Sequence, residues 1–242
     1  MSELQLEGRL AVVTGATRGI GRAIAEALAE RGAEVVISAR HEEDVRRVTE
    51  AMRKSGRQVR GTRCDVQNYD DVVSLMRFAS GDRGGLDILV NNAGVGVFGH
   101  VSEISPGEWD RVIGTNLTGV FYCCHAALPY LRKRGAGHIF NISSLAGKNA
   151  FAGGTAYNAS KFGLGGFSEA LMLDLRHENI KVSYVMPGSV ATEFAGREPS
   201  EKDSWKLTAE DVAEVVLDLL SQEHRALASR VELRPFQPPK KG

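Results

Sequence analysis

The sequence predicts an α/β fold, a doubly wound parallel sheet of about seven strands with helices on both faces. Two observations predict it. Apolar runs of strand length alternate with amphipathic stretches of helical length from one end of the chain to the other. A glycine-rich segment joins the first apolar run to the first amphipathic stretch. Strict alternation of strands and helices implies parallel strands that helices cover on both faces.

The individual elements follow from local patterns. Pro106 suits the first turn of a helix, and Thr208 followed by Asp211 resembles a capping box. The expected strands are Leu10–Thr14, Glu34–Ala39, Gln58–Cys64, Leu86–Val90, His138–Ile142, Lys181–Val185 and Val231–Leu233. The expected helices are Ile20–Glu30, Glu42–Lys54, Asp70–Ala79, Pro106–Arg132, Thr155–His177 and Thr208–Ser221.

Length and composition limit the classes of protein to consider. The 242 residues suit one dinucleotide-binding and catalytic domain over residues 1–242, with a proline-rich tail over 235–242. Lys plus Arg (30) equals Asp plus Glu (30), so no nucleic-acid partner is expected. No apolar run is long enough for a membrane span, and the first residues lack the pattern of a signal peptide. Three cysteines in no metal-binding pattern favour a reducing, cytoplasmic location without a metal site.

The glycine-rich segment is the first candidate for ligand binding. Glycines let a backbone approach a pyrophosphate closely, and the helix that follows offers free N–H groups at its start. The spacing of three residues and then one differs from the common dinucleotide pattern, and a tight turn without a ligand is the alternative. The candidate cofactor-binding residues here are Thr14, Gly15, Thr17, Arg18, Gly19, Ile20 and Gly21.

The end of the second strand indicates which dinucleotide would bind. NAD-binding proteins of this architecture place an acidic residue about 20 positions after the glycines. The second strand instead ends without an acid, Arg40 follows it, and Arg18 lies within the glycine segment. Guanidinium groups would bind a 2′-phosphate, which favours NADP(H) over NAD(H). The alternative is that both are ordinary surface arginines.

Two further turns follow predicted strands and would meet the same ligand. Asp65 and Val66 come after the third strand, where Asp65 could bind an adenine amine or simply cap the turn. Asn92, Ala93 and Gly94 come after the fourth strand. Ligands of such sheets lie outside the carboxyl ends of the strands, which is where both turns fall.

A possible chemical centre follows the fifth strand. Tyr157 and Lys161 are four positions apart and therefore share one face of a helix. An ammonium group beside a phenol favours phenolate, so we expect a lowered Tyr157 pKa and a phenol that can exchange a proton with substrate. Ser144 directly follows the fifth strand, where its hydroxyl could orient a substrate carbonyl.

Taken together, these motifs resemble the classical short-chain dehydrogenase/reductase family, in particular members like 3-oxoacyl-[acyl-carrier-protein] reductases. Residues at further positions also match the family pattern, namely Asn116, Pro187, Gly188, Val190 and Thr192. The matching positions run in the expected order from Thr14 to Thr192.

The resemblance implies a role for each matching residue. Tyr157 would be the catalytic acid and base, and Lys161 would hold the nicotinamide ribose. Ser144 would polarise the carbonyl, and Asn116 would hold a water that relays protons from Lys161. Thr192 would meet the carboxamide or pyrophosphate. The implied reaction is NADP(H)-dependent interconversion of a small-molecule carbonyl and an alcohol. Neither the substrate nor the physiological direction follows from the sequence.

The chain departs from the family pattern in two places. The segment between Gly188 and Thr208 is short and polar, with Arg197 and Glu198 among its charged residues, which predicts an open pocket. Candidate pocket walls are Val95, Val97, Phe98, Phe151, Phe194 and Trp205. The C-terminal segment lacks the glycine-rich turn of tetrameric relatives. A homodimer through the two long helices is therefore expected, with Ala159, Gly163, Gly166 and Ala170 allowing close packing, although a tetramer stays open.

Two other functions stay open at this point. A non-catalytic protein that senses or binds NADP(H) could use the same fold, since fold alone does not decide function. The complete set of Ser144, Tyr157, Lys161 and Asn116 favours an enzyme, because a sensor need not keep a proton donor. An epimerase or dehydratase ranks lower, since such relatives have longer chains and a different glycine spacing.

Overall fold

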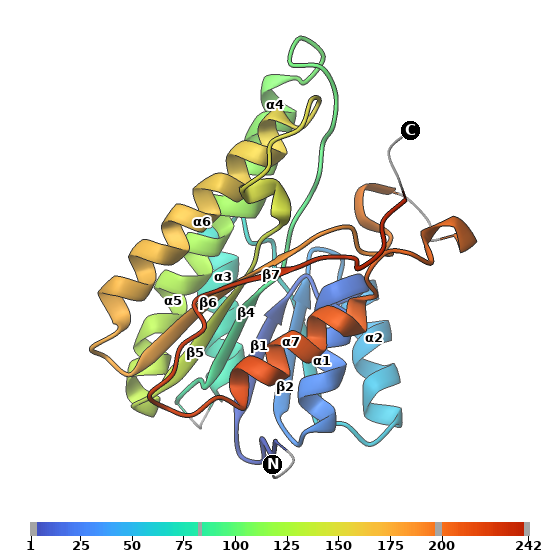
Figure 1. Ribbon diagram of the computed structural model, residues 1–242. Coiled ribbons are helices and arrows are strands. Elements are labelled where there is room, and N and C mark those ends of the chain that lie inside the picture. Colours follow the sequence, from blue (N-terminus) through green and yellow to red (C-terminus); the bar gives the residue numbers. More distant parts are fainter. Residues whose placement is uncertain (1–3, 82–83, 197–199, 240–242) are drawn as a thin grey trace.

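The computed structural model describes residues 4–81, 84–196 and 200–239 (Figure 1). Its sheet has the strand order β3-β2-β1-β4-β5-β6-β7, and every neighbouring pair is parallel. The strands are β1 (Leu10–Thr14), β2 (Glu34–Ala39), β3 (Val59–Arg63), β4 (Ile88–Asn91), β5 (Gly137–Ile142), β6 (Ile180–Pro187) and β7 (Arg230–Leu233). The doubly wound parallel sheet expected from the sequence is confirmed.

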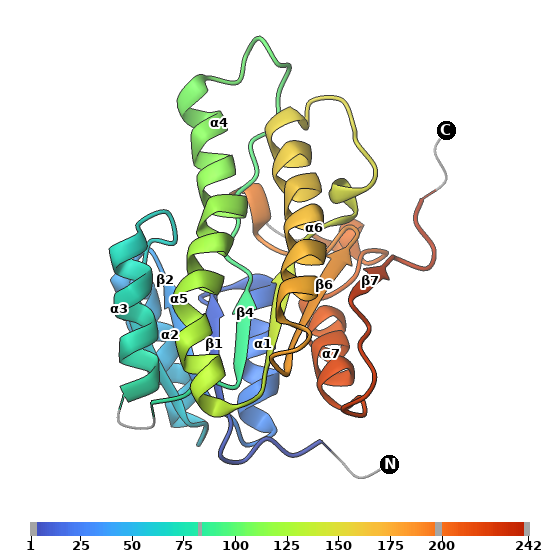
Figure 2. The same cartoon turned by 90° about the vertical axis from the view of Figure 1, so that its left-hand side faces the viewer.

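Helices cover both faces of this sheet, as Figures 1 and 2 show. On one face pack α1 (Gly19–Glu30), α2 (Glu42–Lys54) and α7 (Ala209–Leu220). On the other pack α3 (Tyr69–Ser80), α5 (Gly119–Arg134) and α6 (Thr155–Leu175). Strand β1 feeds both cores through its two-residue period, with Ala11 and Val13 on one side and Leu10 and Val12 on the other.

The single helix expected over Pro106–Arg132 is wrong in one respect. The structure has α4 (Pro106–Ile113), a π-helical turn (Gly114–Thr118) and then α5. The turn contains Asn116, whose side chain bonds to the main chain of Val95 in a distant loop. Single π-helical turns within α-helices often occur at functional sites, and this long-range contact gives the turn a positioning role.

The strand order reverses between β1 and β4, which places their neighbouring carboxyl ends at the point where ligands of such sheets bind. The capping box of Thr208 and Asp211 is present at the start of α7. No helix in the described part of the chain combines the length and apolar character that a membrane span needs. Arg197 and Glu198 of the expected short lid, and residues 240–242 of the expected tail, lie outside the described residues.

Candidate active site

A cleft of about 730 Å³ opens at the carboxyl ends of the strands, a volume typical of ligand pockets. It joins the glycine-rich segment at one end to the Tyr157 region at the other. The predicted residues that line it are Gly15, Thr17, Arg18, Gly19, Ile20, Arg40, Val66, Asn92, Ala93, Gly94, Ser144, Tyr157, Lys161, Pro187, Gly188, Val190 and Thr192. Four of the predicted catalytic and cofactor-binding residues lie outside this lining, namely Thr14, Gly21, Asp65 and Asn116. Of the candidate pocket walls, Val95 and Phe194 line the cleft, and Val97, Phe98, Phe151 and Trp205 do not.

The glycine-rich segment has the geometry of an anion cradle. Gly15 and Gly19 have positive φ angles of 64° and 53°, which residues with a side chain rarely adopt. A Cβ on Gly15 would lie 2.7 Å from the Cα of Ala93. Helix α1 begins at Gly19 with no side-chain cap and no acidic residue in its first turn. Its first N–H groups therefore remain available to a diphosphate.

Thr14 and Asn92 hold this segment in place. The Thr14 hydroxyl accepts hydrogen bonds from the main-chain N–H groups of Asn92 and Ala93, each at 3.1 Å. The Asn92 amide donates to the carbonyl oxygens of Thr14 at 3.0 Å and Gly15 at 2.9 Å. Gly21 belongs to the same support, since a Cβ there would lie 2.2 Å from the Asn92 side chain. These bonds fix the end of β1 against the turn after β4.

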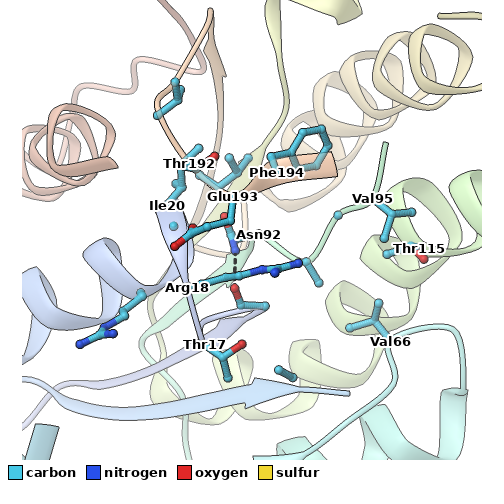
Figure 3. Close-up of a pocket in the computed structure, with 18 of the residues that line it drawn as sticks. Thr17, Arg18, Ile20, Val66, Asn92, Val95, Thr115, Thr192, Glu193 and Phe194 are labelled. Carbon is cyan, nitrogen blue, oxygen red and sulfur yellow. Dashed lines mark hydrogen bonds between the residues drawn. The ribbon is translucent and has the colours of Figure 1, made fainter. Parts of the chain in front are cut away.

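Arg18 and Arg40 both line the cleft with exposed side chains. Figure 3 shows Arg18 extending across the cleft, with Thr17 and Val66 on one side and Thr192 and Glu193 on the other. Within the described residues, neither arginine forms a hydrogen bond or an ion pair with another side chain. Both guanidinium groups are thus available for an anionic ligand such as a 2′-phosphate.

The first turns of α2 add charges that the sequence analysis did not assign to the site. His41, Asp44 and Arg47 line the cleft, and Arg47 pairs with Asp44 at 2.8 Å. The hydrogen bond from Arg47 lowers the Asp44 pKa, and the positive charges of Arg47, His41 and Arg18 add to this effect. His41, Asp44 and Arg47 are three positions apart and therefore share one face of α2, which is the sequence signal that could have identified them.

Asp65 caps its own turn in the structure. Its carboxylate accepts a hydrogen bond from the main-chain N–H of Gln67 at 3.1 Å, and only the neighbouring Val66 lines the cleft. The structure thus shows the capping contact, and a contact with an adenine amine stays a prediction. Other lining residues that the sequence analysis missed follow the strand ends or flank the motifs, among them Thr115, Ser143 and Glu193.

Tyr157, Lys161 and Ser144 come together at the other end of the cleft. Lys161 is 5% exposed, and its ammonium donates to the carbonyl of Ile142 at 2.9 Å. The Lys161 nitrogen lies 5.8 Å from the centre of the Tyr157 ring. Ser144 is the N-cap of a short 3-10 turn (Leu145–Gly147), and its hydroxyl accepts from Ala146 N–H at 3.1 Å. Ser144 follows the end of β5, and Tyr157 and Lys161 lie in the first two turns of α6, so the two elements bring the three side chains close together.

The lowered pKa expected for Tyr157 is wrong, because its surroundings raise the pKa instead. Burial raises the pKa of the Tyr157 phenol, and a hydrogen bond with Ser144 opposes the rise only in part. The positive charge of Lys161, which was expected to lower the Tyr157 pKa, is not among these causes. Burial instead lowers the Lys161 pKa to about 8. Desolvation disfavours the charged form of each group, so Tyr157 keeps its proton near neutral pH while Lys161 loses its own more readily.

Asn116 is fully buried behind this centre. Its amide oxygen accepts from Val95 N–H at 2.8 Å, and its amide nitrogen donates to the Val95 carbonyl at 2.9 Å and the Ser160 hydroxyl at 3.0 Å. Both polar atoms of the side chain are therefore bonded to protein groups. Asn116 links the loop after β4 to α6, the helix that carries Tyr157 and Lys161.

Comparison with known proteins adds to this geometry. A family model described as short chain dehydrogenase matches residues 9–203. An uncharacterized oxidoreductase of Staphylococcus aureus is 35% identical over 231 residues, which cover 95% of this chain and 98% of that protein. Dehydrogenase/reductase SDR family member 4 of Oryctolagus cuniculus is 38% identical over 191 residues, covering 78% of this chain and 74% of the relative.

Solved structures agree in fold and coverage. A metagenomic short-chain oxidoreductase in complex with NADP has 39% identity and a TM-score of 0.84, covering 96% of this chain and 99% of its own. A variant of actinorhodin polyketide ketoreductase with NADPH has 33% identity and a TM-score of 0.86, covering 94% and 96% respectively. The matched range contains the glycine-rich segment, Ser144, Tyr157 and Lys161. The chain belongs to the short-chain dehydrogenase family of oxidoreductases.

Proposed function

We propose that the protein is an NADP(H)-dependent oxidoreductase that interconverts a carbonyl and a secondary alcohol, with Tyr157 as general acid and base. One observation carries the proposal. A partly buried phenol, close to Ser144 and to the buried Lys161, lies at one end of a cleft whose other end is an anion cradle. A dinucleotide spanning the cleft would bring its nicotinamide beside that phenol.

The residues at each end of the cleft have separate tasks. The glycine-rich segment and the start of α1 would hold the diphosphate. Arg18 and Arg40 would bind the 2′-phosphate, which distinguishes NADP(H) from NAD(H). Two structurally similar relatives hold NADP or NADPH, which supports the same preference here. NADPH, when bound, supplies a hydride to the carbonyl carbon and is oxidised in the process.

Tyr157 completes the reduction by giving its phenolic proton to the carbonyl oxygen. The raised pKa of Tyr157 keeps that proton on the phenol at neutral pH, and an alkoxide is a far stronger base than a phenolate. The Ser144 hydroxyl orients the carbonyl oxygen toward the phenol. Lys161, whose pKa burial lowers to about 8, would hold the nicotinamide ribose beside the phenol. Oxidation of the alcohol reverses each step.

The test is the loss of NADPH absorbance against a panel of carbonyl compounds, with NADH and the Tyr157→Phe variant in parallel. We expect turnover with NADPH, much weaker turnover with NADH, and none above background in the variant. Tight NADPH binding without turnover of any compound would favour a sensing protein instead. A clear preference for NADH would remove the roles given to Arg18 and Arg40 while leaving the chemistry.

The same proposal includes a homodimer through α5 and α6. The outward faces of these helices expose Phe121, Phe162 and Leu173. Three of the small residues on α6 are exposed, and nothing lies within 4 Å of a Cβ built on Gly166. Gly163 differs, since a Cβ there would lie 2.9 Å from Leu117 of the same chain. Light scattering tests the dimer, and a monodisperse monomer would contradict it.

A further inference from the structure

Three phenylalanines from separate segments gather around Tyr157 and are called here the aromatic wall. Phe98 lies in the loop after β4, Phe151 lies before α6, and Phe194 follows β6. The ring centres of Phe98 and Phe194 lie 5.4 Å and 5.7 Å from that of Tyr157. Phe151 lies 5.9 Å from Phe98 and extends the surface. Segments that are far apart in the chain thus supply one apolar surface beside the proton donor.

The aromatic wall is open to solvent. Phe98 and Phe151 are each 47% exposed, and Phe194 is 38% exposed. Figure 3 shows Phe194 at the margin of the cleft, beside Thr192 and Glu193. Half-exposed aromatic rings that cluster beside a cleft are typical of ligand-binding walls, whereas single exposed rings need no explanation. Phe194 lines the cleft itself, and Phe98 and Phe151 extend the apolar surface beyond that lining. Burial of these rings by a substrate would remove apolar surface from water.

Gly96 allows the two nearest rings to converge. A Cβ on Gly96 would lie 2.8 Å from the ring of Phe194 and 2.9 Å from the ring of Phe98. A side chain at this position would therefore separate the rings. The Phe98 ring meets Tyr157 edge to face, with an interplanar angle of 69°. This arrangement leaves ring edges and faces to contact a flat aromatic group.

The charges of the cleft lie mainly away from the aromatic wall. The lysine and arginine residues among its described lining are Arg18, Arg22, Arg40, Arg47 and Lys161. All but Lys161 belong to the glycine-rich segment, α1, or the start of α2. Lys161 is buried and bonded to Ile142, and Glu193 adds a carboxylate beside Phe194. Apart from buried Lys161, the described residues that line this end of the cleft include no lysine or arginine to pair with an anionic substrate.

We propose that the aromatic wall selects neutral carbonyl compounds that carry a flat aromatic ring next to the carbonyl, an inference that rests on the proposed function. The ring lies against Phe98 and Phe194, and the carbonyl points to Tyr157 and Ser144. The ketone gains a hydride at carbon from NADPH and a proton at oxygen from Tyr157. The products are the secondary alcohol and NADP⁺, and solvent returns the proton to Tyr157.

The experiment compares three methyl ketones with NADPH, measuring kcat/KM for each. Acetophenone carries a flat ring, cyclohexyl methyl ketone carries a puckered ring of similar size, and 4-acetylbenzoate adds a charge to the flat ring. We expect acetophenone to exceed 4-acetylbenzoate by roughly tenfold or more, because the carboxylate would be desolvated without a partner. Comparable values for these two ketones would overturn the inference.

Matched variants separate recognition from intrinsic ketone reactivity. Phe98→Leu keeps an apolar side chain but removes the ring, so the ratio of acetophenone to cyclohexyl methyl ketone should fall roughly 3- to 10-fold. Phe194→Leu should act in the same direction. Phe236→Leu, at a ring that is 93% exposed in the C-terminal segment, should leave the ratio unchanged. An unchanged ratio in both wall variants, with NADPH affinity retained, would overturn the inference.

Different results would contradict the aromatic selection and the proposed reductase activity. Efficient reduction of aliphatic or anionic ketones without preference for acetophenone removes the aromatic selection and keeps the reductase. If no ketone turns over, ligand-observed NMR on the NADP⁺-loaded protein measures binding of the same three compounds. Selective binding of acetophenone that Phe98→Leu weakens supports the wall even then, and absence of selective binding overturns it.

Discussion

The side chains of Asp87 and Lys161 are both almost inaccessible to solvent, at 3% and 5% exposure. Asp87 lies where the strands begin, at the amino edge of the sheet, and Lys161 lies where they end, at the carboxyl edge. Asp87 precedes β4 at the amino edge, where its carboxylate accepts from Arg9 at 2.8 Å, Arg134 at 2.9 Å and Leu10 N–H at 2.9 Å. Lys161 lies at the carboxyl edge, and the described structure gives its ammonium one hydrogen bond, to a neutral carbonyl. One buried charge is compensated and the other is not.

The difference separates a charge that maintains the fold from a charge at the candidate active site. Two arginines and a main-chain N–H join Asp87 to β1 and α5, so this carboxylate ties distant segments together. Burial of Lys161 without a carboxylate opposes folding, because desolvation disfavours its charged form. Such a group is expected where function requires it, since active sites commonly reduce stability.

The largest stability effect is expected at Asp87. Asp87→Ala leaves two guanidinium groups and a main-chain donor without their partner and should lower the free energy of unfolding by about 2–4 kcal/mol. The value is placed below that of a fully buried pair because Arg9 and Arg134 are partly exposed. Urea denaturation measures it. NADPH affinity should stay unchanged. A large loss of NADPH affinity in the folded variant would show that Asp87 also affects the cofactor site, which would contradict the distinction between the two edges.

Lys161→Met should have the opposite effect on stability. The methionine keeps the apolar stem and removes the buried charge, so the free energy of unfolding should rise by about 1–3 kcal/mol at pH 7. Reductase activity should be lost in the same protein. Denaturation and activity assays on one preparation test both parts, and a destabilised variant would show that Lys161 contributes to the fold.

The pH dependence of this gain provides a control. The folded pKa of Lys161, about 8, lies below its ordinary value of 10.5, so the unfolded chain binds more protons between these values. Stability of the unmodified protein should therefore rise with pH across that window. The advantage of Lys161→Met should be complete below pH 8 and should shrink as the pH approaches 10. A constant difference over pH 7–10 would contradict the assigned pKa.

A smaller effect is expected at the cofactor end of the carboxyl edge. Arg40→Ala removes a guanidinium that the described structure leaves without a partner side chain. Its Kd for NADPH should rise roughly tenfold, while the Kd for NADH and the stability should change little. Fluorescence titration with both nucleotides measures this. Arg57→Ala, at an arginine that pairs with Glu30 away from the cleft, is the matched control.

Local patterns predict most of the sheet and the site. The apolar runs of β1 and β2 are buried throughout their centres, and their alternation with helices decides the parallel order. The spacing of the glycine-rich segment, Tyr157 and Lys161 along the chain predicts them as site residues, and the structure brings them to one cleft. Strand β4 begins two residues later than expected, at Ile88.

Features that depend on distant contacts could not be found in this way. The π-helical turn at Asn116 depends on a contact with Val95. Phe98, Phe151 and Phe194 are among the candidate pocket walls that the sequence suggests, but their ring contacts with one another and with Tyr157 are visible only in the structure. The pKa of Tyr157 was misjudged because the sequence shows the spacing to Lys161 but not the burial of the phenol. Trp205, a candidate wall residue, does not line the cleft, and its ring lies beside Lys206 instead.

The most direct test of the central claim is a single turnover of protein loaded with NADPH, in which Tyr157→Phe is compared with the unmodified chain. The phenylalanine keeps the ring and its contacts with Phe98 and Phe194 but removes the proton. The account predicts that the rate of NADPH oxidation falls about 10²- to 10⁴-fold while NADPH affinity and unfolding free energy are retained. A rate close to that of the unmodified protein would contradict the role of Tyr157 as proton donor.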